Sequence, residues 1–241
     1  MWDFEQGEVL AFDKPLHWTS FDLVAKVRYN LCKKLGTKKL KVGHTGTLDP
    51  LATGVVIICT GRKTKLIDQL QYDVKEYVAT LQLGATTPSY DLEKEIDRTY
   101  PTEHITRELI DRTIPLFKGE QWQTPPAFSA IQINGKRAYE FARKGEEVEL
   151  KPRLLVIDEI EVLSFDEEKM LLTIRVVCSK GTYIRALARD IGERLQSGAH
   201  LTALRRTRVG DTRVEDCYTI EQFLEKLNAE SSKRLCTNPM I

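Results

Sequence analysis

The sequence predicts a mixed α/β fold, in which a sheet of several strands is flanked by helices of different lengths. Two observations support this. Apolar and β-branched segments of strand length recur along the whole chain, and segments with helical spacing separate them at irregular intervals. The regular βαβ alternation of a doubly wound parallel sheet is not present. Because no internal repeat or low-complexity linker divides the 241 residues, we expect a single domain over 1–241.

The first half of the chain is expected to form three strands and two helices. The strands are GEVLAFDKP (7–15), TGVVIICTG (53–61) and EYVATLQLG (76–84). Ser20 is expected to begin a helix that Gly36 ends. The apolar side of this helix is expected to be Phe21, Val24, Ala25, Leu31 and Leu35. A second helix is expected over 106–117.

The second half is expected to open with a loop, a hairpin and a short helix over 124–145, because this segment contains a double proline and an Asn-Gly pair. LLVIDEIEVLSF (154–165) and MLLTIRVVCS (170–179) are typical of two strands joined by a short turn. The clearest helix of this half is GTYIRALARDIGERLQSG (181–198). HLTALRRTRVG (200–210) is expected to be extended, and 219–227 to form a final helix before a polar tail from Asn228.

Composition and cysteine usage indicate a cytoplasmic protein that does not enter a membrane. The longest apolar run, VVIIC (55–59), is far shorter than the roughly 20 residues of a membrane-spanning helix. The N-terminal segment lacks the basic and apolar regions of a signal peptide. Five scattered cysteines without a C-x-x-C pair favour reduced thiols over disulfides or a zinc site.

Charge is segregated along the chain although the net charge is only +1. Seven basic residues and no acidic one lie between Lys26 and Lys41, and a second basic-rich stretch at 175–213 includes LRRTR. Acidic residues gather elsewhere, at 91–97, 146–149 and 158–161. This pattern fits a face that follows phosphates. Solvated helix faces are the alternative, and the sequence leaves both open.

The stretch GHTGTLDPLATG (43–54) surrounds a single carboxylate, Asp49, with glycines and threonines. It is either a surface turn or an active-site loop that presents this carboxylate. The chain lacks the glycine patterns of a phosphate loop or a dinucleotide fold, and it lacks the nucleophile elbow of hydrolases. Its four histidines have no metal-ligand spacing. We therefore expect no cofactor and no metal, with the chemistry coming from side chains.

Six blocks, in order, resemble the TruB family of tRNA pseudouridine synthases. They are DKP (13–15), GHTGTLDPLATGVV (43–56), KEYVATLQLG (75–84), PPAFSAIQINGKRAYEFARKG (125–145), CSKGTYIRALARDIG (178–192) and HLTALRRTRVG (200–210). The resemblance implies a pseudouridine-synthase fold with a mixed, largely antiparallel sheet. It also implies an enzyme that converts the T-loop uridine conventionally numbered 55 to pseudouridine without a cofactor.

Three residues match the family's catalytic positions. Asp49 matches the catalytic aspartate, and Arg185 the arginine that pairs with it. An arginine close to an aspartate typically lowers the pKa of the carboxyl group by about 1–3 units. Tyr77 matches the tyrosine that stacks on the target base. Taken singly, these residues would fit a turn, a solvent-facing helix position and an ordinary cross-strand aromatic.

Four further residues match positions that contact the substrate: His44, Tyr183, Lys14 and Leu204. The resemblance assigns His44 to the T loop near the extruded base, and a general-base role is its alternative because histidine titrates near neutrality. Tyr183 and Leu204 alone would be interpreted as core residues, and Lys14 as the end of a strand.

Residues 124 to about 152 correspond to the family's insertion that grips the T-arm of tRNA, and they carry Lys136, Arg137, Arg143 and Lys144. A hairpin packed on the domain is the alternative for the outer half. About 30 residues follow 200–210, too few for the C-terminal PUA domain of longer relatives. We therefore expect a compact monomer that acts on tRNA without a PUA domain, a guide RNA or a membrane. A non-catalytic tRNA-folding chaperone and a synthase for another T-loop-like RNA are the alternatives.

Overall fold

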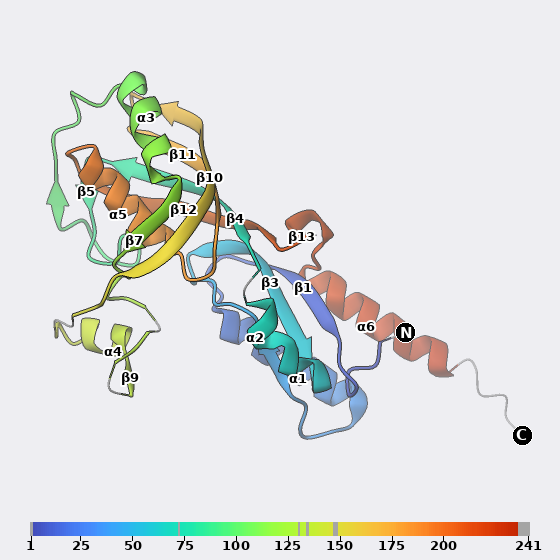
Figure 1. The fold of residues 1–241 in the computed structure, drawn as a ribbon. Coiled ribbons are helices and arrows are strands. Elements are labelled where there is room, and N and C mark those ends of the chain that lie inside the picture. Colours follow the sequence, from blue (N-terminus) through green and yellow to red (C-terminus); the bar gives the residue numbers. More distant parts are fainter. Residues whose placement is uncertain (1, 72, 130, 134, 147–148, 236–241) are drawn as a thin grey trace, which may run out of the picture. The chain divides into compact units, whose positions relative to one another are not determined.

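The structure is a computed structural model that describes residues 2–71, 73–129, 131–133, 135–146 and 149–235, with the backbone alone from residue 230 onward. It comprises two compact units (Figure 1). The first unit consists of Met1–Lys75 with Arg205–Ile241, and the second of Glu76–Leu204. The chain therefore leaves the first unit once and returns to it once.

The first unit is built on a small sheet with β3 at its centre. Its strands are β1 (Val9–Lys14), β2 (Val42–His44), β3 (Ala52–Thr60), the C-terminal part of β12 (Ala199–Val209) and β13 (Thr212–Arg213). β1 runs antiparallel to β3, with Val9 opposite Cys59 and Lys14 opposite Gly54. From Val55 to Thr60 β3 is buried at every position, as its uninterrupted apolar sequence predicts.

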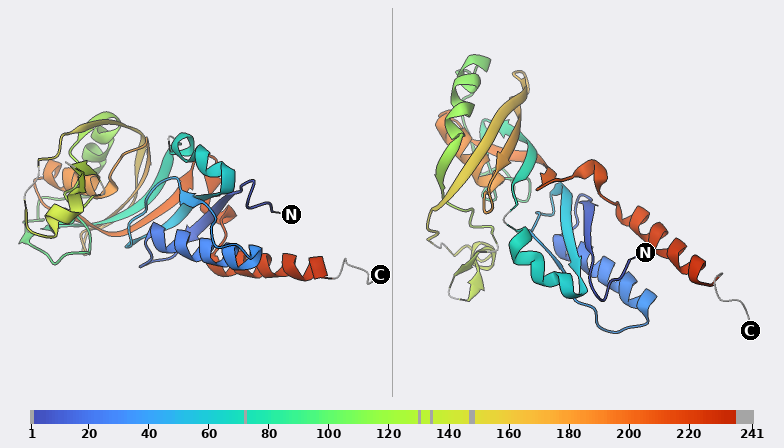
Figure 2. Two further views of the ribbon diagram at one scale, coloured as in Figure 1. Left: turned by 90° about the horizontal axis from the view of Figure 1, so that it is seen from below. Right: turned by 45° about the vertical axis from the view of Figure 1, so that its right-hand side comes forward.

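Helices α1 (Ser20–Leu35) and α6 (Ile220–Leu235) lie side by side in this unit (Figure 2), and a short helix α2 (Ile67–Leu70) follows β3. α1 buries one side of its surface, formed by Leu23, Val24, Val27 and Leu31. Lys34 on α1 donates a hydrogen bond to the Leu227 carbonyl of α6. The two helices are thus joined by a polar contact as well as by packing.

The beginning of α1 differs from the prediction. Thr19, not Ser20, is the N-cap, and it forms a capping box with Asp22. Phe21 was predicted to be apolar and inward, but it is 66% exposed. Leu23, Val27 and Leu31 define a buried side that places Phe21 outside it, because positions three and four apart share a helix face. Gly36 ends the helix in the left-handed conformation, as predicted.

The second unit contains a sheet in the order β12, β4, β11, β10, β7. The bounds are β4 (Lys75–Leu83), β7 (Gly119–Gln123), β10 (Arg153–Asp166) and β11 (Leu171–Cys178). β10 is antiparallel to both β11 and β7. Along β4 buried and half-buried residues alternate, so successive side chains point to opposite faces of the sheet.

Smaller elements complete this unit. They are β5 (Ala85–Thr86), β6 (Arg98–Thr99), β8 (Gln132–Ile133), β9 (Lys136–Arg137), α3 (Arg107–Thr113), α4 (Ala138–Ala142) and α5 (Ile184–Arg194). β8 and β9 form the hairpin predicted around Asn-Gly, of which Asn134 lies outside the described residues. α5 is amphipathic, and it buries Ile184, Leu187 and Ile191.

Three helices have other bounds than predicted. α5 covers Ile184–Arg194 of the predicted 181–198. α3 ends at Thr113, and a 3-10 turn over Ile114–Phe117 follows it. Pro115 accounts for this, because proline lacks the N–H that an α-helix needs. α6 continues to Leu235, beyond the polar tail predicted from Asn228. Alanine, glutamate, lysine and arginine favour helices, so polarity alone was a wrong guide to its end.

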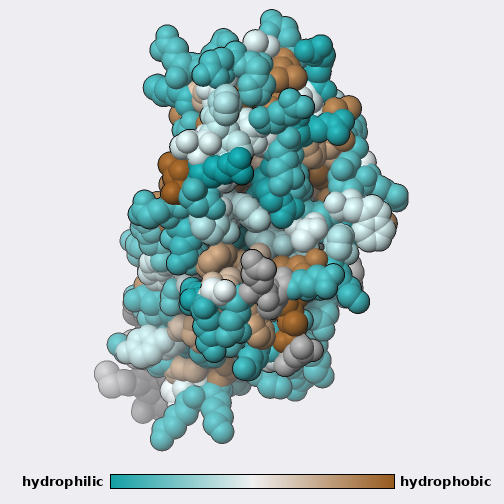
Figure 3. Space-filling model, turned by 90° about the vertical axis from the view of Figure 1, so that its left-hand side faces the viewer, coloured by the Kyte–Doolittle hydropathy of each residue, from teal (hydrophilic) through white to brown (hydrophobic). Residues whose placement is uncertain are grey.

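Hydrophilic residues predominate on the face shown in Figure 3, and hydrophobic residues form small separate patches there. The mixed α/β fold predicted from the sequence is confirmed by the strands and helices of both units. Within the described ranges no helix has the length and hydropathy needed to cross a membrane.

Candidate active site

Asp49 lies in the first unit, in the loop between β2 and β3. Its own carbonyl accepts a hydrogen bond of 3.0 Å from the Ala52 N–H. The next carbonyl, of Pro50, accepts one of 2.8 Å from the His17 N–H. The chain around Asp49 is therefore fixed on its C-terminal side.

Ser20 fixes the residue before Asp49. Its hydroxyl accepts a hydrogen bond from the Leu48 N–H at 2.8 Å and donates one to the Leu48 carbonyl at 3.1 Å. The Ser20 side chain is buried together with that of Leu48. The residue that the sequence suggested as a helix cap thus anchors the loop instead.

Arg206 of β12 fixes the preceding part of the loop. Its guanidinium donates from Nε to the Val55 carbonyl at 2.7 Å, from Nη2 to Gly46 at 3.2 Å and from Nη1 to Thr47 at 3.4 Å. Only 3% of Arg206 is exposed. The rigid fork of an arginine suits such simultaneous contacts, and it connects the loop to β3.

Lys14, at the end of β1, is fully buried in the same unit. Its ammonium donates hydrogen bonds to the carbonyls of Pro15 at 2.9 Å and Trp18 at 2.6 Å. Burial lowers the pKa of Lys14 to about 8, while the negative charge of Asp49 acts in the opposite direction. Near neutral pH the lysine is therefore charged, and it adds a cation to the surroundings of Asp49.

His44, at the end of β2, is partly buried, and its Nδ1 has no hydrogen-bond partner within the described ranges. Burial lowers the pKa of its imidazole. The ring is therefore neutral at pH 7, with one nitrogen able to donate and the other to accept a hydrogen bond.

Arg185 of α5 belongs to the second unit and is 6% exposed. Its guanidinium donates to the carbonyls of Phe128 at 2.8 Å and Ser89 at 3.2 Å, and its Nε lies 3.6 Å from the Asp91 carboxylate. The solvent-facing alternative for Arg185 is wrong. Several fixed partners hold its side chain in one orientation.

Tyr183 is the residue immediately before α5, where it occupies the N-cap position. The amide side chain of Gln123 accepts a hydrogen bond from the Tyr183 N–H at 2.9 Å and donates one to its carbonyl at 3.2 Å. The side chain of Tyr183 is half-buried. The backbone that carries Tyr183 and leads into Arg185 is thus anchored to β7.

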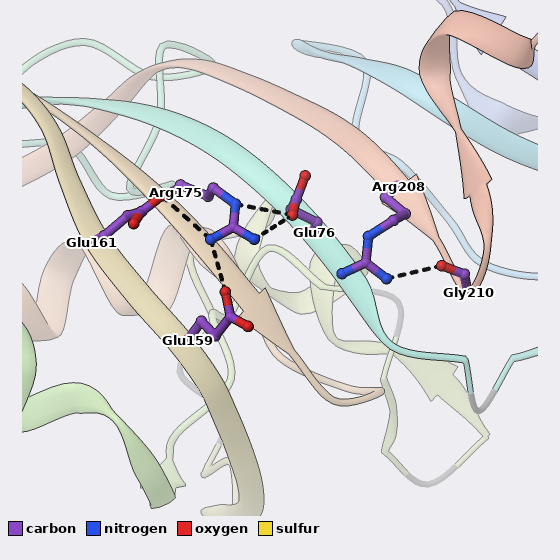
Figure 4. A network of polar contacts seen from close by, with 6 residues as sticks. All are labelled: Glu76, Glu159, Glu161, Arg175, Arg208 and Gly210. Atoms are coloured by element: carbon purple, nitrogen blue, oxygen red, sulfur yellow. Dashed lines mark hydrogen bonds and ion pairs between the residues drawn. The ribbon is translucent and has the colours of Figure 1, made fainter.

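Tyr77 of β4 is 8% exposed, and the residue before it takes part in a charged cluster on the opposite face of the sheet. There Arg175 binds Glu76 at 2.7 Å, Glu159 at 2.8 Å and Glu161 at 3.3 Å (Figure 4). Hydrogen bonds to Glu159 and Glu76 raise the pKa of Arg175. The cluster ties β4 to β10 and β11 next to Tyr77.

Comparison with known proteins shows the family of the chain. A model described as "TruB family pseudouridylate synthase (N terminal domain)" matches residues 33–184, and one described as "tRNA pseudouridylate synthase B C-terminal domain" matches residues 185–240. Proteins named tRNA pseudouridine synthase B from Phocaeicola vulgatus and Bacteroides thetaiotaomicron are each 66% identical, over 95% of this chain and 96% of theirs. The chain belongs to the TruB family of tRNA pseudouridine synthases.

Solved structures support the fold of this TruB-family enzyme. The chain is similar to one in a Cbf5-Nop10-Gar1 complex, with 30% identity and a TM-score of 0.68, over 92% of this chain and 54% of the other. A Nop10-Cbf5 complex of an archaeal box H/ACA particle gives 26% identity and a TM-score of 0.67, over 95% of this chain and 56% of the other. This chain thus spans about half the length of the matched chain in each of these structures. The predicted pseudouridine-synthase fold is confirmed.

The predicted site residues are distributed over both units of the TruB-family chain. Asp49, His44 and Lys14 belong to the first unit, whereas Tyr77, Tyr183, Arg185 and the half-buried Leu204 belong to the second. The predicted pair of Asp49 and Arg185 joins residues of the two units and stays a prediction. No group of three metal-ligating side chains occurs in the part of the chain that the structure describes.

Two residues that position the Asp49 loop were missed by the sequence analysis, Ser20 and Arg206. In a strand, residues two positions apart share a face. The residues that share a face with Arg206 do not form an apolar pattern, so nothing in the sequence marked Arg206 as buried. For the basic stretch LRRTR the sequence left open a phosphate-binding face or a solvated face, and two of its arginines are instead held by partners within the protein. Arg206 is buried, and Arg205 binds the Asp13 carboxylate at 2.7 Å.

Proposed function

We propose that this enzyme isomerises the T-loop uridine at position 55 of tRNA, with Asp49 as the reacting carboxylate. The observation that carries the proposal is the fixed backbone of the Asp49 loop, where Leu48 is held by Ser20 and residues 46 and 47 by Arg206. A reacting group that is held in one geometry before the substrate binds reacts faster, because the entropy cost of ordering it does not add to the activation free energy.

The reaction breaks the glycosidic C–N bond, rotates the uracil and forms a C–C bond between the same two partners. Nothing is oxidised and no group leaves, so neither an oxidant nor a group carrier is needed. An ionised Asp49 serves in this reaction either by covalent addition or by removing a proton from the sugar. Lys14 and Arg185 are proposed to favour the ionised form of the carboxylate.

The uridine must leave the stacked T loop before it reacts, which costs a few kcal/mol. Tyr77 is proposed to stack on the extruded base, and one such contact returns about 1–3 kcal/mol. His44 is proposed to contact the T loop, and Tyr183 and Leu204 to line the pocket. The neutral imidazole of His44 favours this contact over a charged interaction.

The segment 124–152 is proposed to grip the T-arm. Its described part is a two-stranded hairpin followed by α4, and it exposes the basic side chains of Lys136, Arg137 and Lys144. Basic groups on a hairpin suit phosphate contacts. We propose that the enzyme acts in the cytoplasm as a monomer, as one catalytic domain and without a guide RNA.

The decisive experiment assays pseudouridine formation in an unmodified T-arm stem-loop. The wild-type enzyme is expected to convert the uridine at position 55, and Asp49→Asn to form no product. Asp68→Asn is the matched control, because Asp68 is an exposed aspartate on α2 of the same unit. Full activity of Asp49→Asn would show that Asp49 is not the reacting carboxylate. If the wild type bound the RNA but formed no product, the result would favour a tRNA-folding chaperone.

A further inference from the structure

A basic surface covers the solvent side of α1 and the loop that follows it. Its members are Lys26, Arg28, Lys33, Lys38, Lys39 and Lys41. All but the half-buried Arg28 are exposed, and none of the six forms an ion pair within the described ranges. No acidic residue lies in the sequence between Lys26 and Lys41. We call this group the α1 surface. Its positive charge is not balanced by ion pairs within the described ranges.

An aromatic ring lies at the centre of the α1 surface. Tyr29 is 66% exposed and follows Lys26 by three positions and precedes Lys33 by four, so the three side chains share one face of the helix. The buried side of α1 points the other way, through Leu23, Val27 and Leu31. Tyr29 therefore contributes little to the core and is available for contact with a partner.

The α1 surface is connected to the Asp49 loop by the helix itself. Ser20, at the first turn of α1, binds the backbone of Leu48. From Ser20 the helix axis advances about 1.5 Å per residue, which places Lys33 roughly 20 Å farther along. The α1 surface therefore lies in the same unit as the Asp49 loop and extends to roughly 20 Å from the Ser20 anchor along the helix.

We infer that the α1 surface binds the sugar–phosphate backbone of the tRNA substrate at nucleotides away from the target uridine. The inference rests on the proposed function, because it takes the tRNA to be bound at Asp49. Charge complementarity selects the partner: lysines that neutralise phosphates release counterions, whereas a neutral or basic partner gains nothing from them. Tyr29 adds a flat apolar contact to a base or a ribose.

The test compares two double variants of the full-length enzyme with equal change of charge. In the first, Lys33→Ala is combined with Lys39→Ala on the α1 surface. In the control, Arg107→Ala is combined with Lys169→Ala, two exposed residues whose charges are already paired with Asp111 at 2.8 Å and Asp166 at 3.2 Å. Binding to full-length tRNA is measured between 50 and about 300 mM salt.

The α1 double variant is expected to bind tRNA about tenfold or more weakly near 100 mM salt, and its plot of log K against log salt to be shallower by about 1.4–1.8. The control is expected to match the wild type. Equal binding and an equal slope for both doubles would overturn the inference. Product formation by the wild type at saturating tRNA tests the proposed function separately.

Tyr29→Ala supplies an independent readout. It is expected to weaken tRNA binding about fivefold or more while leaving the salt slope unchanged, because a stacking contact releases no counterions. Its thermal unfolding is expected to match the wild type, since the ring is mostly exposed. Unchanged tRNA binding by Tyr29→Ala would show that Tyr29 does not contact the tRNA.

Discussion

At the scale of single residues, the backbone around Asp49 is held by partners that lie far from it in sequence. Ser20 binds Leu48, and Arg206 binds the carbonyls of Gly46 and Thr47. The glycine-rich loop with its one carboxylate could be predicted from the sequence. Its supports could not, because a buried serine or arginine has the same local pattern as an exposed one.

Arg206→Lys tests whether these supports matter for catalysis. A lysine keeps the charge but lacks the planar fork, so it cannot reproduce the three carbonyl contacts. Because a misplacement of about 1 Å can cost on the order of 100-fold in rate, we expect kcat to fall about 100-fold with a much smaller change in KM. Steady-state kinetics and a thermal melt check this. A normal kcat in a folded variant would show that Arg206 does not position the loop.

Lys14→Met tests the buried cation beside Asp49. Burial lowers the pKa of Lys14 to about 8 in the folded protein, against the ordinary lysine value of 10.5. Between these values the unfolded chain binds the proton that the folded chain has lost, so Lys14 makes the free energy of unfolding rise with pH there. We expect the wild type to gain stability relative to Lys14→Met from about pH 8 to 10.5, and not below pH 8. Urea unfolding at each pH measures the difference, and a constant difference across this window would contradict the assignment.

Tyr77→Phe separates stacking from the chemistry of the hydroxyl group. The phenyl ring retains its face for the extruded base, so RNA binding is expected to stay within about threefold of the wild type. Fluorescence titration of a T-arm stem-loop provides the measurement. A large loss of binding would show that the hydroxyl group contributes to the bound ground state.

At the scale of elements, strands were easier to predict than the ends of helices. β3 is a continuous apolar run because both of its faces are buried. β4 alternates because one of its faces is more deeply buried than the other. Helix ends depend on single backbone groups, as Pro115 after α3 shows. The buried side of α1 was misjudged at Phe21 because spacing alone does not say which of two neighbouring faces meets the sheet.

Gly54→Ala tests how closely β3 approaches β12. Gly54 has a φ of +109°, and a Cβ there would lie 2.1 Å from the backbone oxygen of Arg206. We expect a loss of more than about 4 kcal/mol in unfolding free energy, or failure to fold. Gly36→Ala is the control, because Gly36 also has a positive φ but open space around it, and about 1–2 kcal/mol is expected there. Equal losses in urea unfolding would show that the close approach carries no cost.

At the scale of the whole molecule, the chain forms two compact units, and the predicted site residues come from both. The order of six sequence blocks was enough to identify the family. Hydrogen-bond partners such as Gln123 for Tyr183, or Asp91 for Arg185, could not be predicted, since they depend on how distant segments meet in space.

We propose that Asp49 acts in the chemical step rather than in holding the RNA. The most direct test of this proposal is a single-turnover assay of Asp49→Asn with T-arm RNA, in which binding and pseudouridine formation are followed in the same sample. We expect Asp49→Asn to bind within a few fold of the wild type and to form no detectable pseudouridine. Pseudouridine formed at the wild-type rate by the Asp49→Asn enzyme would contradict the proposal.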